Sequence, residues 1–376
     1  MSKFLFKLIP LLLFPCFLHA QIKVDINVHI PRKTTDNLYL AGNFNNWRAN
    51  NEAFRLQQKD SLNYFIRLNL PPEMYEYKVA RAEWSKVEVQ NDGKSIPNRF
   101  FRLKQDTAIN ITVASWADFY KQTILQHSYS KNVHIADTAF YIPQLNKFRR
   151  IWIYLPPSYK NTGKRYPVLY MHDGQNLFDV KTSGYGEWGI DEILDSLNNG
   201  SAKQMIVVGI DHGGDDRLKE YNPYNSQYGK AEGKAYADFL VKTLKPYIDK
   251  NYHTLRDTKH TAIAGSSMGG LISMYALAKY PKIFGSAGIF SPAFWLAPNI
   301  YADVAELLPK SASNKIYFVA GAQESKGMLP NMERLFKQLN PEGKNKNIVL
   351  TEKQDGKHSE WFWHREFVDF YKFILR

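Results

Sequence analysis

The sequence predicts a chain of two domains, a small all-β domain followed by a larger α/β domain. Residues 21–114 contain short alternating strands separated by turns, and residues 138–376 alternate apolar strands with helical runs. A length of 376 residues with 44% hydrophobic content is sufficient to bury two cores. Residues 115–137, which are polar and aromatic without strong periodicity, form the predicted linker.

The first twenty residues, MSKFLFKLIPLLLFPCFLHA, have the pattern of a secretory signal peptide. Two lysines precede an apolar stretch that is too short to span a bilayer, and the segment ends on the small residue Ala20. We therefore expect cleavage after Ala20 and a secreted or periplasmic mature chain. The only cysteine, Cys16, lies inside this segment, so the mature chain is expected to contain neither a disulfide nor a thiol nucleophile.

Charge and composition argue against several classes of partner. The formal net charge is +13, but the basic residues are scattered and form no run of five or six, which makes nucleic-acid binding a poor interpretation. A basic chain of this kind would still attract anionic surfaces or substrates mildly. After the signal peptide, no apolar run is long enough for a membrane span. No metal-ligand spacing is evident, so neither a metal nor an organic cofactor is expected.

The early strands predict a small immunoglobulin-like β-sandwich. Four segments with alternating apolar residues recur at the spacing of such a domain: NLYLAGNFNNW, NYFIRLNL, YEYKVA and TAINITVA.

Residues 265–269, Gly-Ser-Ser-Met-Gly, predict a nucleophile elbow. The apolar strand HTAIA precedes them, and the helical run LISMYALAKY follows and stops at Pro281. In the α/β-hydrolase fold, the central serine of Gly-x-Ser-x-Gly occupies a sharp turn between strand and helix, with its hydroxyl exposed at the end of the sheet. That serine is Ser267, with Ser266 beside it. The alternative is that Ser267 only caps the helix.

An acid and a histidine follow in the order that this fold requires. Glu324 comes after the strand KIYFVAG, and His358 comes after the strand NIVLTEK, so both are expected at the same sheet edge as Ser267. We interpret His358 as the general base and Glu324 as the group that orients it. The alternatives are Asp355 as the acid, although it also suits a turn before glycine, and His364 as the base.

The strand YPVLYM, followed by HDGQNLF, predicts the oxyanion hole. In this fold one N–H comes from the residue after the nucleophile, here Met268, and another from the loop after the third strand. Within that loop we favour the amide of Gln175, with Gly174 next. His172, at the strand end before a turn, is more consistent with a structural role than a catalytic one.

From about residue 149 to the C-terminus, the chain resembles the putative-esterase (esterase D-like) family of α/β-hydrolases, which includes feruloyl and acetyl-xylan esterases and ferric-enterobactin esterases. The matching blocks are RRIWIYLPPSY (149–159), YPVLYMHDGQNLF (166–178), EWGIDEIL (187–194), VVGIDHGGDDRLKEYNPY (207–224), IAGSSMGG (263–270), GAQE (321–324) and GKHSEWFW (356–363). The resemblance implies that Ser267 is the nucleophile and His358 the base. Glu324 occupies the position where the family often has aspartate.

The same resemblance points to four further residues near the substrate or bracing its loop: Trp188, Arg217, Glu220 and Tyr221. The alternative is loop scaffolding through an Arg–Glu pair.

The early domain resembles the early-set modules related to glycogen-binding domains, carbohydrate-binding module family forty-eight, through AGNFNNW (41–47), YEYKV (75–79) and Trp84. The resemblance implies that Trp47, Lys78 and Trp84 hold a sugar. After Lys78 the chain has Ala-Arg-Ala-Glu where such modules usually have an Asp-Gly turn. The alternative is that both tryptophans are core or inter-domain anchors.

The resulting hypothesis is a secreted serine esterase that hydrolyses acyl esters on polysaccharides such as feruloyl or acetyl xylan. A trilactone siderophore of the enterobactin type is the alternative substrate. A non-catalytic carbohydrate-binding protein is the alternative from another class.

Overall fold

The computed structural model describes residues 21–45, 47–120, 126–198, 203–226, 229–309 and 313–376. The chain divides into two compact units, Met1–Ile124 and Leu125–Arg376. The predicted signal peptide lies outside the described residues. Within them, no helix combines the length and apolar character needed to cross a bilayer.

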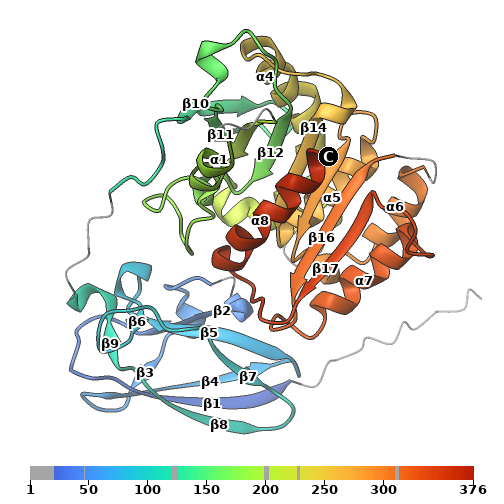
Figure 1. Ribbon diagram of the computed structural model, residues 1–376. Helices are drawn as coiled ribbons and strands as arrows, with labels where there is room; N and C mark the ends of the chain where they lie inside the picture. The colour runs from blue at the N-terminus through green and yellow to red at the C-terminus, as the bar shows by residue number, and fades with distance from the viewer. Residues whose placement is uncertain (1–20, 46, 121–125, 199–202, 227–228, 310–312) are drawn as a thin grey trace, which may run out of the picture. The chain divides into compact units, whose positions relative to one another are not determined.

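The first unit is built from short strands. A four-stranded sheet has the order β3-β4-β1-β8, a three-stranded sheet has the order β2-β5-β7, and β6 pairs with β9 (Figure 1). The bounds are β1 Ile22–His29, β2 Tyr39–Gly42, β3 Gln57–Gln58, β4 Asn63–Leu70, β5 Met74–Ala80, β6 Glu88–Val89, β7 Arg99–Arg102, β8 Thr107–Thr112 and β9 Ser115–Trp116.

Alternation along the strands produces the core of this unit. Val24, Ile26 and Val28 are buried at every second position of β1, and they share one core cluster with Tyr77 of β5. Because both larger sheets contribute to one core, the arrangement supports the predicted all-β domain; the immunoglobulin-like sandwich itself stays a prediction.

The expected linker at 115–137 differs from the structure. Trp116 is fully buried and pairs with Glu88 of β6, so β9 belongs to the first unit. Val133 opens β10 (Val133–Ile142) and pairs with Tyr154 in the second unit. These pairings are between residues far apart in the sequence, which local periodicity does not reveal.

The second unit contains an eight-stranded sheet of order β10-β11-β13-β12-β14-β15-β16-β17. From β13 to β17 in this order every neighbouring pair is parallel. The strand β11 pairs antiparallel with both of its neighbours, β10 and β13. The remaining strands are β11 Lys147–Tyr154, β12 Val168–His172, β13 Ile206–Ile210, β14 Thr261–Ser266, β15 Ser286–Phe290, β16 Lys315–Gly321 and β17 Ile348–Lys353.

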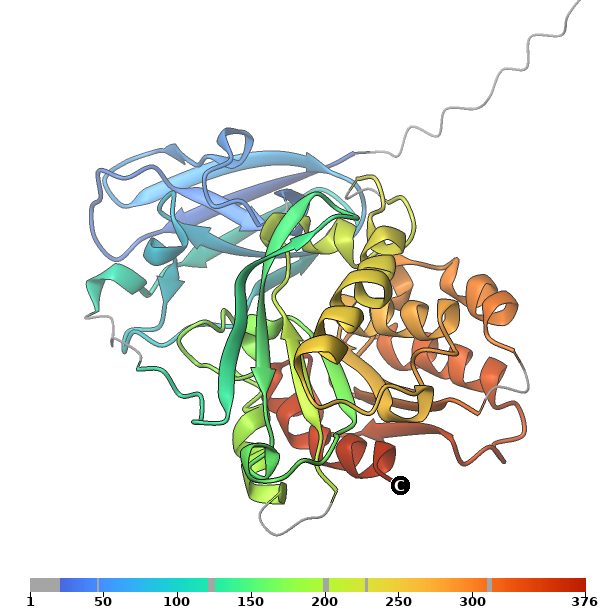
Figure 2. The same cartoon turned by 90° about the horizontal axis from the view of Figure 1, so that it is seen from above.

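Helices cover both faces of this sheet (Figure 2). Ile263 of β14 faces one core cluster, with residues of α3 to α7, and its neighbours Ala262 and Ala264 face a second cluster, with residues of α1 and α8. The helices are α1 Ile190–Asn198, α2 Arg217–Glu220, α3 Gly233–Phe239, α4 Lys245–Asn251, α5 Met268–Lys279, α6 Ile300–Leu307, α7 Met328–Leu339 and α8 Glu360–Ile374, with a π-helix at Leu240–Leu244 between α3 and α4. Strands buried on both faces account for the nearly continuous apolar runs in the sequence.

The loops that follow β16 and β17 touch each other through their backbones. Ala322 N–H donates to the Lys353 carbonyl (2.9 Å), and Gln323 N–H donates to the Gly356 carbonyl (3.0 Å). A Cβ on Gly321 would overlap the backbone of Gly356, so this approach requires glycine. This contact holds the loop that carries Glu324 next to the loop that carries His358.

We predict that Gly321→Ala destabilises the fold by about 1–3 kcal/mol, because the added methyl forces the two loops apart. Gly163→Ala is the control, since a Cβ there would meet nothing within 4 Å. Urea unfolding of both variants measures the effect. Equal midpoints for the two variants would contradict this account of the loop contact.

Candidate active site

Ser267 occupies a strained turn between β14 and α5. Its backbone has φ 57° and ψ −118°, a conformation that costs a non-glycine residue about 1–3 kcal/mol unless its surroundings enforce it. Two hydrogen bonds do so: Ser267 N–H donates to the Phe290 carbonyl (2.9 Å), and Ala293 N–H donates to the Ser267 carbonyl (3.0 Å). This is the backbone expected of a nucleophile elbow.

Glu324 and His358 form a direct acid–imidazole pair. Nδ1 of His358 lies 2.6 Å from Oε2 of Glu324, whose side chain is fully buried, while the His358 side chain is 42% exposed. A carboxylate only accepts hydrogen bonds, so Nδ1 carries the proton in this pair. Nε2 is thereby left to accept a proton from another group.

The other Glu324 oxygen is also fixed. Oε1 accepts from the Ser291 hydroxyl (2.7 Å) and from Gly321 N–H (2.7 Å). Trp363 Nε1 donates to the Ser291 oxygen (2.9 Å), and the Trp363 ring meets the His358 ring edge-on at 5.0 Å. The carboxylate therefore has one orientation, and the imidazole is supported on a second side.

Sequence reasoning missed Ser291 and Trp363. Ser291 directly follows β15, at the same sheet edge as the residues it supports, and this position was the available signal. Nothing in the sequence pattern distinguishes Trp363 from the other aromatic residues of α8.

The alternative acid and base lie outside this pair. Asp355 is exposed and forms an ion pair with Arg365. His364 places Nδ1 2.5 Å from the carbonyl of Trp188.

The loop after β12 is held by a partly buried ion pair. Asp173 has φ 58°, and its carboxylate accepts two hydrogen bonds from Arg217, at 2.7 and 2.8 Å. Burial alone would raise the pKa of Asp173, but the Arg217 guanidinium outweighs it and holds that pKa below its usual value. Asp173 N–H also donates to the Tyr221 hydroxyl (3.3 Å). Asp173, the first residue of the loop 173–175, is thus held through both its side chain and its backbone N–H.

Arg217 does not pair with Glu220, contrary to the alternative considered for these residues. Glu220 is fully buried and instead pairs with Lys147 (2.8 Å) and Arg149.

Trp188 is only 2% exposed and stacks on Trp363 at 5.6 Å, so it supports the site from the core. The partners of Arg217, Glu220 and Trp188 are distant in the sequence, so the sequence motif alone could not show which groups these three residues contact.

Gln175 and Met268 are the predicted oxyanion donors, and this role stays a prediction. Met268 begins α5, so its N–H belongs to the first helical turn, which lacks partners within the helix. Gln175 lies in the short 3-10 helix after Asp173; its Oε1 accepts from His212 N–H (3.2 Å), and its Nε2 is buried without a hydrogen-bond partner among the described residues.

Two further ionisable groups lie beside this loop. Burial lowers the pKa of His172 to about 4, so the ring is neutral near pH 7, and its Nδ1 lies 3.0 Å from the Tyr236 hydroxyl. Burial, together with the negative charge of Asp173, raises the pKa of Glu360 to about 7. Glu360, which sequence reasoning did not identify, begins α8 two residues after His358.

We predict that Glu324→Gln lowers kcat on p-nitrophenyl acetate by about 10⁴-fold, the loss typical of a triad acid converted to its amide. The amide cannot compensate an imidazolium and can hold His358 in the wrong tautomer. Asp355→Asn is the matched control and should change kcat little, because Asp355 bonds to Arg365. The reverse ranking would give the acid role to Asp355.

The chain is similar to known esterases in sequence and in fold. A family model described as "Putative esterase" matches residues 142–372. YbbA of Bacillus subtilis, described as uncharacterized, is 25% identical over 242 residues, which cover 59% of this chain and 90% of YbbA. The endo-1,4-beta-xylanase/feruloyl esterase of Xylanibacter ruminicola is 29% identical over 211 residues, 54% of this chain and 27% of that protein. The chain thus matches about a quarter of the length of that relative.

A solved structure shows the same fold over most of the chain. The enterobactin esterase FES from Shigella flexneri has a TM-score of 0.52 at 14% identity, covering 96% of this chain and 93% of that one. The family model spans well over half of the sequence and includes the residues of the site described above. The protein therefore belongs to this esterase family and is a carboxylic-ester hydrolase.

Proposed function

We propose that the protein is a secreted serine esterase that cleaves acyl esters on polysaccharides, of the feruloyl or acetyl type, with Ser267, His358 and Glu324 as its catalytic triad. The observation that carries this proposal is the buried Glu324 carboxylate, fixed at both oxygens and bonded to His358 Nδ1 at 2.6 Å. The strained Ser267 supports it, because it follows β14 in the same parallel sheet, two strands from β16.

In this mechanism Ser267 Oγ attacks the ester carbonyl carbon while His358 Nε2 takes the hydroxyl proton. Glu324 stabilises the imidazolium that forms. The proton then passes from His358 to the leaving alkoxide as the ester C–O bond breaks, leaving an acyl-enzyme. Water attacks the acyl-enzyme by the same route, with His358 as base, and releases the acid and free Ser267.

The negative oxygen of each tetrahedral intermediate would be bound by Met268 N–H and by the loop of residues 173–175. Such donors act best when they do not have to reorganise during the reaction. The Arg217–Asp173 ion pair and the Tyr221 hydroxyl support this requirement, because they fix that loop in advance. Gln175 Nε2, which has no hydrogen-bond partner among the described residues, is a further donor suited to an oxygen of the substrate.

Two tryptophans of the first unit support a polysaccharide as the substrate. The rings of Trp47 and Trp84 lie 6.2 Å apart at 38°, and Trp84 is 46% exposed. Lys78, the third predicted sugar contact, is half-buried, which lowers its pKa. Within this unit Trp116 occupies the core, whereas Trp47 and Trp84 remain accessible in part. An accessible aromatic pair suits stacking on sugar rings better than it suits a core anchor.

A trilactone siderophore is the second candidate substrate. The specific observation in its favour is the likeness of fold to an enterobactin esterase over 96% of this chain. Removal of Lys3 and Lys7 with the signal peptide lowers the formal charge from +13 to +11, which still suits an anionic ferric complex. Secretion is part of the proposal and rests on the signal-peptide pattern of residues 1–20; an N-terminus at Gln21 in the mature protein would support it.

The decisive experiment assays the chain from Gln21 onward on p-nitrophenyl acetate, methyl ferulate, acetylated xylan and ferric enterobactin. We expect hydrolysis of the simple esters and of the polysaccharide ester, with kcat lowered by about 10⁴–10⁶-fold in Ser267→Ala. Ser266→Ala is the control and should retain most activity. Preference for ferric enterobactin would favour the second candidate, and an active Ser267→Ala would contradict the triad.

For the first unit, we predict that replacing both Trp47 and Trp84 with Ala weakens apparent affinity for polymeric substrate several-fold to tens-fold, since each stacking contact contributes about 0.5–1.5 kcal/mol. Turnover of p-nitrophenyl acetate should not change. Phe100→Ala, which removes another exposed aromatic side chain of this unit, is the control. A lower melting temperature with equal losses on both substrates would identify the tryptophans as anchors instead.

A further inference from the structure

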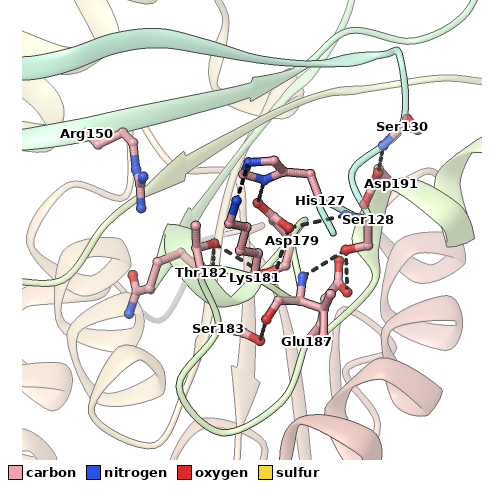
Figure 3. Close-up of polar contacts among 12 residues, drawn as sticks. His127, Ser128, Ser130, Arg150, Asp179, Lys181, Thr182, Ser183, Glu187 and Asp191 are labelled. Atoms are coloured by element: carbon pink, nitrogen blue, oxygen red, sulfur yellow. Dashed lines mark hydrogen bonds and ion pairs between the residues drawn. The ribbon is translucent and has the colours of Figure 1, made fainter. Parts of the chain in front are cut away.

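Three acidic side chains come together where α1 begins. Glu187 precedes the helix, and Asp191 and Glu192 lie in its first turn. One carboxylate oxygen from each residue lies within 4.8 Å of the other two. Figure 3 shows Glu187 and Asp191 facing the segment that carries Ser128 and Ser130.

Two oxygens of this cluster are buried without a hydrogen-bond partner. Asp191 is fully buried; its Oδ2 accepts from Ser130 N–H (2.6 Å), but its Oδ1 has no partner among the described residues. Glu187 Oε2 accepts from the Ser128 hydroxyl (2.9 Å), and its Oε1 is likewise without a partner. A buried oxygen without a donor is costly, so each calls for a proton or a cation.

The neighbouring basic side chains, His127 and Lys181, contact other groups. His127 Nδ1 lies 2.6 Å from Asp179 Oδ2, and Lys181 Nζ lies 3.4 Å from His127 Nε2 (Figure 3). Among the described residues, neither His127 nor Lys181 is bonded to the acidic cluster.

We propose that Glu187, Asp191 and Glu192 bind a calcium ion. The cluster offers only oxygen ligands, which hard cations prefer, and contains none of the His or Cys ligands typical of zinc. Calcium binds oxygen ligands at about 2.3–2.6 Å in flexible geometry, so three oxygens that all lie within 4.8 Å of one another can reach one ion. Magnesium demands a stricter octahedral geometry and usually keeps several waters, so a cluster of three carboxylates suits it less well.

The position of this site gives the ion a structural role near the oxyanion loop. Ser128 and Ser130 attach residues 127–130 to the acidic cluster. On the other side, Trp188 N–H donates to the Asn176 carbonyl (2.8 Å) and Ile190 N–H to the Leu177 carbonyl (3.0 Å), directly after Gln175. A bound calcium ion would therefore stiffen the backbone against which the Gln175 loop rests, without touching the substrate.

Terbium luminescence tests this assignment on the full mature chain, because Trp188 is adjacent to Glu187 and can sensitise a bound Tb³⁺ ion. We expect one Tb³⁺ site that calcium displaces and that weakens at least tenfold in Glu187→Gln and in Glu192→Gln. The exposed Asp215→Asn is the matched control and should bind as the wild type does. Glu192 is also exposed, so its variant should fold even if changes at buried Asp191 do not.

Thermal melts provide a second readout that is independent of ester hydrolysis. Free calcium at a hundred times its Kd should raise the wild-type Tm by about 5–10 °C relative to chelator, and this shift should be lost in Glu187→Gln. Equal stabilisation by magnesium would overturn the choice of ion. An unchanged Tm with calcium, or Tb³⁺ binding that persists in both variants, would overturn the site and leave a shared proton as the explanation of the orphan oxygens.

Discussion

The buried carboxylate of Glu324 is where four segments of the α/β unit meet. Its donors are Ser291 after β15, Gly321 at the end of β16 and His358 after β17, and Trp363 of α8 holds Ser291 in turn. A carboxylate buried without partners would cost several kcal/mol, so the burial of Glu324 depends on these contacts. The packing of these segments at the sheet edge and the orientation of the imidazole therefore both involve this carboxylate.

Backbone strain at this sheet edge also costs conformational free energy. Asp173 and Ser267 both have positive φ, and neither is glycine. Each costs about 1–3 kcal/mol, which tertiary contacts must offset. For Asp173 these contacts are Arg217 and Tyr221, and for Ser267 they are the neighbouring residues Phe290 and Ala293. These contacts keep both residues in their strained conformations, as the proposed oxyanion hole and nucleophile would need.

Local pattern was sufficient to predict the order of strands and helices around Ser267, Glu324 and His358, because each follows an apolar strand of a parallel sheet. It was insufficient for the partner of Arg217, since Asp173 is 44 residues away in the sequence. It also misplaced the linker, because the pairing of Trp116 with β6 is non-local. The acidic cluster at α1 resembles any charged first turn, and only burial and missing donors distinguish it.

Covalent labelling with diisopropyl fluorophosphate, followed by peptide mass spectrometry, tests the central claim most directly. The reagent phosphorylates a serine only where a neighbouring base activates it. The account predicts one adduct, on Ser267, with a labelling rate that falls strongly when His358 is replaced by Ala. An adduct on Ser266, or labelling of Ser267 at an unchanged rate without His358, would contradict the triad.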